Sequence, residues 1–168
     1  RKPQDRAFEN MANHTAIFGA PLPTNAQVLW LPENLVASWL ILHRASYYSD
    51  GQMSGQMFSR DTARYGNLRA DKIRLLQEAS LRCLRDNATP DLQSRCKIDN
   101  HALHTACAPG PVPPPDFIVM PHRQAQGIAG QWDVINPSDG QIALTYYLYS
   151  CSSLMQTLGN TQAQSAPH

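Results

Sequence analysis

The sequence predicts an α+β fold in which N-terminal helices pack on a small C-terminal antiparallel sheet, with disulfides stapling the two parts together. Three observations lead to this prediction. Apolar residues recur at helical spacing through the first two thirds of the chain, a proline-rich stretch follows, and the remainder has the alternation and turn residues of a β-hairpin. The length of 168 residues suits one domain.

These patterns divide the chain into an arm, a domain and a tail. We expect an N-terminal arm over 1–25, a single globular domain over 26–158 and a flexible tail over 159–168. Within the domain, the helical part is 26–107, the proline-rich connector is 108–115 and the strand part is 116–158. In the arm, a short helix is expected over 5–11, and Ile17 and Phe18 should hold the following loop on the domain.

The segment 28–48 is strongly apolar and predicts a central buried helix. Pro32 and Glu33 suit its first turn, because proline is tolerated there. Its inward residues recur at helical spacing: Leu35, Trp39, Leu42 and Ser46. The helical part is shorter than the roughly 20 apolar residues that span a bilayer, so we expect a core element rather than a membrane helix.

The repeat Gly-Gln-Met-Ser-Gly-Gln-Met follows this segment and places Met53 four residues before Met57. Two thioethers at this spacing could bind a soft ion such as Cu(I). The two glycines favour instead a loop whose methionines cap the core, which is our prediction.

A second helix is expected over 59–87. Ser59 is a suitable N-cap, Asp61 lies in the first turn, and Gly66 with Asn67 could divide the helix in two. Its apolar stripe comprises Ile73, Leu76, Ser80, Cys83 and Leu84.

A third helix is predicted from Thr89, Pro90 and Asp91 to about Ala106, because an N-cap, a proline at the first position and an acid in the first turn signal a helix start. Its inward stripe comprises Leu92, Cys96, Asp99, Leu103, Ala106 and Cys107.

The chain has four cysteines, which are Cys83, Cys96, Cys107 and Cys151. No two of them form a CxxC motif, which argues against a zinc ribbon, a thioredoxin-type site and covalently attached haem. Two disulfides would require an oxidising compartment; the alternative is four reduced thiols in a cytosolic protein. On one continuous helix, Cys96 and Cys107 would lie about 16 Å apart and could not bond. Cys83 then bonds to Cys96 or Cys107. We prefer Cys83 with Cys96 across a tight turn, and Cys107 with Cys151.

The connector Ala-Pro-Gly-Pro-Val-Pro-Pro-Pro should be extended. Its residues Pro113 and Pro114 are candidates for an interaction with an aromatic groove, although a stiff connector is the commoner role.

The strand part begins with a short strand over 117–120. The segments 131–135 and 141–149 flank the turn residues 136–140 and predict a hairpin. In its second strand, Tyr147 and Tyr149 alternate with apolar residues. They are candidates for an exposed aromatic interaction face, or they cover the second side of the sheet. A short helix should follow to about residue 158.

Candidate chemistry is sparse. His101 and His104 lie one helical turn apart with Cys107 a turn further on, which could form a nitrogen and sulfur metal site. The HExxH pattern is absent, as are GxSxG, P-loop and GxGxxG motifs and any paired-carboxylate motif. We therefore expect no cofactor and a non-enzymatic protein.

The formal charge of +1 and the scattered basic residues argue against nucleic acid as a partner. The chain starts at Arg1 rather than Met; a removed signal peptide, a membrane anchor that would place the domain near a membrane, or trimming would each explain this start. We expect an extracytoplasmic domain, periplasmic or secreted, that assembles with other protein subunits, as in a secretion or pilus machine of the cell envelope. The alternative is a small secreted hydrolase or metal-binding protein that uses His101 and His104.

Overall fold

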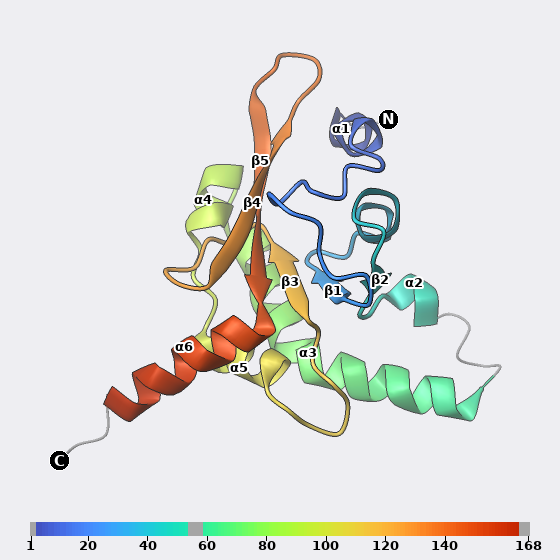
Figure 1. The fold of residues 1–168 in the computed structure, drawn as a ribbon. Helices are drawn as coiled ribbons and strands as arrows, with labels where there is room; N and C mark the ends of the chain where they lie inside the picture. Colours follow the sequence, from blue (N-terminus) through green and yellow to red (C-terminus); the bar gives the residue numbers. More distant parts are fainter. Residues whose placement is uncertain (1–2, 54–58, 165–168) are drawn as a thin grey trace.

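The fold is built on a five-stranded mixed sheet with the strand order β2-β1-β3-β5-β4 (Figure 1). A computed structural model describes residues 3–53 and 59–164. The strands are β1 (Gln27–Trp30), β2 (Ala45–Ser46), β3 (Phe117–Met120), β4 (Ile128–Ile135) and β5 (Ile142–Ser150). β1 is parallel to β2 and β3, whereas β5 is antiparallel to β3 and β4.

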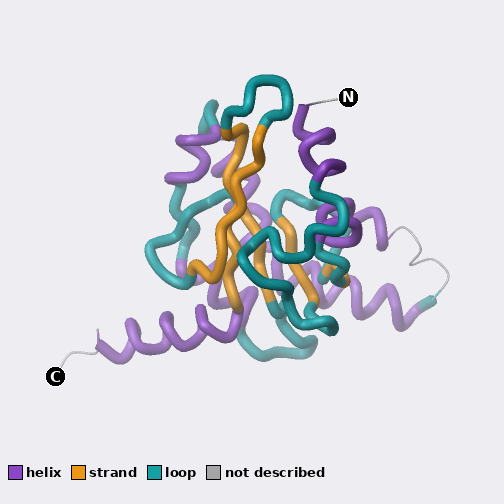
Figure 2. The backbone as a smooth tube through the Cα atoms, turned by 45° about the horizontal axis from the view of Figure 1, so that its top comes forward, coloured by secondary structure: helices purple, strands orange, loops and turns teal. Residues whose placement is uncertain are grey.

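Helices cover one face of this sheet, and the N-terminal segment covers the other (Figures 1 and 2). The helices of the first face are α3 (Arg60–Asp86), α4 (Pro90–Arg95), α5 (Asn100–Cys107) and α6 (Cys151–Gln164). On the opposite face lie α1 (Pro3–Asn10), the loop after it and the short π-helix η1 (Ala37–Ile41). Because side chains alternate along each strand, neighbouring strand residues enter two separate cores.

The α+β fold with two disulfides is confirmed, but the sheet is not confined to the last third of the chain. β1 and β2 come from the N-terminal half and pair parallel, with Leu29 opposite Ile118 in β3. A parallel neighbour requires a long crossover, and here the helices from α3 to α5 form it. The sheet is therefore mixed rather than antiparallel.

The prediction of a central helix over 32–48 is wrong. The apolar run at 28–30 is strand β1, a cis peptide bond joins Leu31 to Pro32, and the helical part is only η1 with the two residues before it. Trp39, expected to be buried, is 46% exposed, and Ser46 lies in β2. β1 lies between two strands, and both of its faces are buried in a core. Its residues 28–30 are therefore all apolar and lack the alternation of apolar and polar residues that indicates a strand.

The second helix is confirmed. Ser59 caps α3 by accepting a hydrogen bond from the amide of Thr62, at 3.3 Å. The helix continues through Gly66 and Asn67 without a break. Its predicted stripe is buried at Ile73, Leu76, Ser80 and Cys83 and half-buried at Leu84.

The third helix starts where predicted, with the Thr89 hydroxyl accepting from the amide of Leu92, but it is not continuous. It ends at Arg95, and the chain is extended at Cys96 and Asp99 before α5 starts. Asp99, predicted to point inward, is the exposed N-cap of α5 instead, and Leu92 is also exposed. The carboxylate is better placed here because it accepts a hydrogen bond from the amide of His101.

The hairpin and the strand over 117–120 are confirmed. β4 and β5 pair in register from Gly130 with Leu148 to Val134 with Leu144, and an Asn136–Gly140 turn joins them. The predicted C-terminal helix is α6, which continues to Gln164, beyond the expected end. In the arm, α1 matches the expected helix, and Phe18 is buried against the sheet.

The loop predicted at 51–57 is wrong in its first three residues, which are helical because α2 covers Asp50–Met53. Met57 and the other residues of that loop lie outside the described residues. No helix in the described ranges is both long and apolar enough to cross a bilayer.

Candidate functional site

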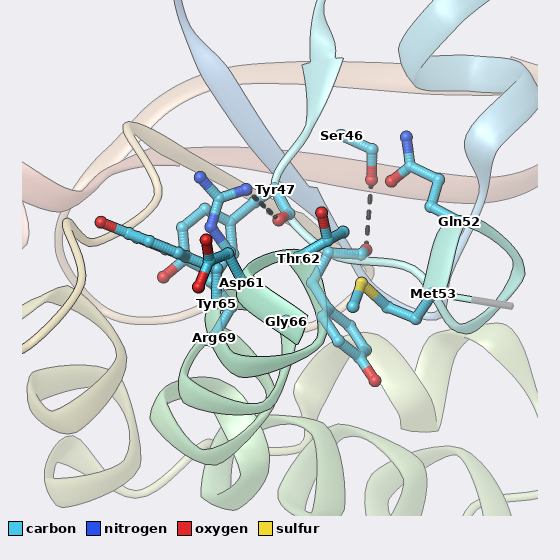
Figure 3. Close-up of a pocket in the computed structure, with 10 residues that line it drawn as sticks. Ser46, Tyr47, Gln52, Met53, Asp61, Thr62, Tyr65, Gly66 and Arg69 are labelled. Atoms are coloured by element: carbon cyan, nitrogen blue, oxygen red, sulfur yellow. Dashed lines mark hydrogen bonds between the residues drawn. The ribbon is translucent and has the colours of Figure 1, made fainter. Parts of the chain in front are cut away.

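A hollow of about 420 Å³ lies between β2, α2 and the first turns of α3 (Figure 3). We call it the tyrosine–arginine groove. Its lining combines aromatic, polar and thioether side chains: Ser46, Tyr47, Tyr48, Gln52, Met53, Asp61, Thr62, Tyr65, Gly66 and Arg69. Half of the lining comes from β2, the two residues after it and α2, and half comes from one face of α3, so the groove exists only in the folded chain.

The strand side of the groove is held by hydrogen bonds. The Tyr47 hydroxyl donates to the carbonyl of Pro113 at 2.7 Å, and the Tyr48 hydroxyl donates to a carboxylate oxygen of Asp50 at 2.9 Å. Tyr47 and Tyr48 directly follow β2; Tyr47 is buried in the core, whereas Tyr48 is partly exposed at the groove. The amide of Asp50 in turn donates to Glu33 at 2.9 Å.

The helix side centres on Arg69. Its guanidinium lies over the Tyr47 ring, with the central carbon 4.8 Å from the ring centroid, and its Nη1 donates to the Tyr47 carbonyl at 2.9 Å. Gly66 lies one turn after Thr62 on the same helix face and also lines the groove. Tyr65 lies one turn before Arg69 and is 58% exposed. A fixed cation therefore lies beside a largely exposed aromatic ring.

Tyr47 and Tyr48 are both neutral at physiological pH. Burial raises the pKa of Tyr47 to about 12, and the neighbouring Arg69 cation opposes this rise. Burial, the hydrogen bond to Asp50 and the negative charges of Asp50 and Glu33 raise the pKa of Tyr48 to about 12. The two phenols thus keep their protons and donate the hydrogen bonds to Pro113 and Asp50.

The lining of the groove is rich in residue types that are common at protein–protein interfaces. No histidine or cysteine is among the lining residues given above, and the Ser46 hydroxyl donates to the carbonyl of Tyr48 at 3.1 Å instead of facing a base. Nucleophilic catalysis requires a nucleophile within hydrogen-bond reach of a base. Tyrosine, arginine and methionine are enriched at protein–protein interfaces, and tyrosine and arginine dominate their energetic hot spots.

A serine and a histidine do meet elsewhere, but in the core. The Ser80 hydroxyl lies 2.9 Å from Nε2 of His122, and Nδ1 of His122 lies 2.8 Å from the carbonyl of Gln93. A carbonyl only accepts, so Nδ1 carries the proton and Nε2 accepts from Ser80. Ser80 is 1% exposed and His122 is 0% exposed, so no substrate reaches this pair. It joins α3 and α4 to the end of β3.

The predicted cysteine pairs form. Cys83 bonds to Cys96 with 5.8 Å between their Cα atoms, and Cys107 bonds to Cys151 with 5.0 Å. The preferred pairing is confirmed although one premise was wrong, since Cys96 and Cys107 do not share a helix.

The predicted metal ligands do not converge on a site. His101 and His104 lie on α5, exposed and half-buried respectively, and Cys107 is engaged in a disulfide. Across the described ranges, no group of three histidine, cysteine or acidic side chains could hold a metal ion.

The interaction candidates of the strand part and connector lie mostly inside the domain. Tyr147 is 7% exposed and Tyr149 0% exposed, so they cover the helical face of the sheet and form no exposed aromatic surface. Pro113 is exposed, but its carbonyl accepts from Tyr47, and Pro114 lines a second hollow beside the disulfide of Cys107. The C-terminal half of the connector is thus packed on the domain, with Val112 buried as well.

Sequence reasoning missed the tyrosine–arginine groove and the Ser80–His122 pair. One signal was available for the groove, since Tyr65 and Arg69 are four residues apart on a predicted helix and so share a face. The meeting of this face with Tyr48 depends on the unpredicted strand β2.

Comparison with known proteins assigns no relative: no family model matches the chain, and no curated protein or solved structure is significantly similar to it.

Proposed function

We propose that this chain is an extracytoplasmic protein-interaction domain that binds another protein subunit in the tyrosine–arginine groove. The observation that carries the proposal is the exposure of Tyr65 beside Arg69 at the mouth of a preformed hollow. Large aromatic side chains that face solvent next to a fixed arginine are the residues that contribute most to protein binding.

Two disulfides support the compartment part of the proposal, because such bonds persist in oxidising environments and are rare in the cytosol. We propose the periplasm or the cell exterior, and an assembly of the cell envelope such as a secretion or pilus machine as the setting. The partners are then other protein subunits, and binding rather than catalysis is the activity.

Site-specific cross-linking in the native host tests the proposal. A photoreactive phenylalanine analogue at position 65 should cross-link to one protein that mass spectrometry identifies, and the same analogue at position 81 should not. Leu81 is the matched control because it lies on the same helix and is 57% exposed, like Tyr65 at 58%.

The identified protein is then purified and titrated with the wild-type chain and two variants. Tyr65→Ala should weaken binding by about 30-fold or more, the change that a hot-spot residue produces. Leu81→Ala should leave the affinity within about threefold. Equal effects of the two substitutions, or cross-linking from position 81 alone, would refute the groove as the binding site.

A further inference from the structure

The outer edge of β4 is open. β4 is the last strand of the sheet, and among the described residues it pairs only with β5. The inter-segment backbone hydrogen bonds of the described chain include none to residues 128–134. The other outer strand, β2, is only two residues long. An open edge presents rows of amide and carbonyl groups to which another strand can bond.

The regular part of this edge is short and lightly protected. Register shifts lie between Ile128 and Gly130 and between Val134 and Ile135, so the regular segment is 130–134. Native edges are usually blocked by charged side chains, above all lysine, by proline, by β-bulges or by covering chain, and here the two register shifts and Asp133 limit the open part to this short segment. This segment, Gly-Gln-Trp-Asp-Val, contains neither lysine nor proline.

The N-terminal arm covers a face of β4 rather than its edge. A Cβ atom on Gly130 would lie 2.7 Å from the carbonyl oxygen of Phe18. The side chains of residues 130, 132 and 134 share one face, and Trp132 and Val134 on that face are buried in the aromatic core with Phe18. Only glycine allows the arm to approach this closely.

A second copy of the chain suits this edge in one register. Suppose that two β4 strands pair antiparallel about a twofold axis perpendicular to the sheet. Each face of one sheet then continues into the same face of the other sheet only if the axis passes at the level of a residue and not between two residues. An axis at Asp133 would place two carboxylates opposite each other. An axis at Gln131 would pair only residues 130–132 of the regular segment.

An axis at Trp132 uses the whole regular segment. It places Gln131 of each copy opposite Asp133 of the other, and Gly130 of each copy opposite Val134 of the other. Within one chain, the Gln131 amide already donates to a carboxylate oxygen of Asp133 at 3.2 Å, so the two groups are chemically matched. We propose that two copies of this chain pair through β4, centred on Trp132, to form one ten-stranded sheet.

This pairing uses a different surface from the tyrosine–arginine groove and can be tested apart from it. The dissociation constant of the full 168-residue chain is measured by sedimentation velocity from about 10 μM to 1 mM. Gln131→Lys faces Asp133 of the second copy and should strengthen the dimer, whereas Gln131→Glu should weaken it. Each change should be roughly two- to thirty-fold, because two symmetric cross-strand pairs are altered.

Gln156→Lys and Gln156→Glu are the charge-matched controls, since Gln156 is exposed on α6 away from this edge. Thermal unfolding of each variant verifies that it is folded. Opposite shifts at position 131 with no shift at position 156 support the pairing. A chain that stays monomeric at 1 mM, or a dimer that responds equally at both positions, overturns it.

Discussion

On one face of the sheet the helices α3 to α6 are held by two disulfides and a buried hydrogen-bond network; on the other, an irregular N-terminal segment lies over aromatic rings. All four cysteines belong to the helical face or its border. The arm face has instead a cluster in which Phe8 lies 5.3 Å from Trp132 and Trp30 lies 5.0 Å from Tyr146, between ring centroids.

The two faces stabilise their short helices in different ways. α4 and α5 have six and eight residues and α1 has eight, all too short to be stable as isolated helices. On the helical face, the disulfides stabilise the short helices. On the arm face, the burial of large aromatic rings stabilises α1. The stability of the arm face therefore depends on single side chains.

The largest expected effect concerns the covalent bonds. Replacing Cys107 and Cys151 together by alanine should lower the free energy of unfolding by about 4 kcal/mol, because the bond closes the longer loop. Replacing Cys83 and Cys96 should cost about 3 kcal/mol. The sequence separations are 44 and 13 residues. Denaturant unfolding under oxidising conditions measures both losses, and a larger loss for the shorter loop would contradict the entropic account.

A somewhat smaller effect is expected on the arm face. Phe8→Ala should lower the free energy of unfolding by about 3 kcal/mol, since it removes a ring in contact with three others. The near-ultraviolet circular dichroism of the tryptophans should weaken, and proteases should cut the arm before the helices. Leu81→Ala, at an exposed position, should change stability by no more than about 0.5 kcal/mol. Uniform cleavage of both faces would show that they do not unfold separately.

The smallest expected effect is a pH dependence of stability that comes from His122 in the core of the helical face. Burial lowers the pKa of the His122 imidazole, outweighing its hydrogen bonds to Gln93 and Ser80. As pH falls through about 6.5, the unfolded chain binds a proton at His122 that the folded chain does not. The free energy of unfolding should therefore fall with pH below that value, by at most about 1.4 kcal/mol per pH unit for this group.

The matched variant is His122→Gln, which cannot titrate. Subtracting its unfolding free energies between pH 5 and 7 from those of the wild type isolates the contribution of His122. A difference that does not change with pH would show that the buried ring gains no proton on unfolding. Ser80→Ala should cost about 1–3 kcal/mol at neutral pH, because Nε2 of His122 is left without its donor.

Much of the fold could be predicted where the signals were local. Ser59 and Thr89 marked helix starts because their hydroxyls reach amides three residues later. The Asn136–Gly140 turn marked the hairpin because its side chains bond within the turn. The Cys83–Cys96 bond followed from the short connection between these residues, and Cys107 with Cys151 was then the remaining pair.

Prediction failed where a distant partner decides the conformation. The run at 28–30 is a strand because β3, about ninety residues later, pairs with it on one side and β2 on the other. Alternation alone left two interpretations for Tyr147 and Tyr149, and the second one, coverage of the other side of the sheet, is correct because helices pack there. The candidate site was missed for the same reason, since Tyr48 and Arg69 meet only when β2 lies beside α3.

The sequence by itself determined the α+β class, the ends of α3, the hairpin and the bond between Cys83 and Cys96, because each depends on residues close together in the chain. Only the tertiary structure decided that the sheet is mixed, that both its faces are buried, that Ser80 and His122 bond inside the core, and that Tyr65 and Arg69 line an open groove. These features depend on which elements pack together, and packing is decided by the burial of surfaces brought from distant parts of the chain.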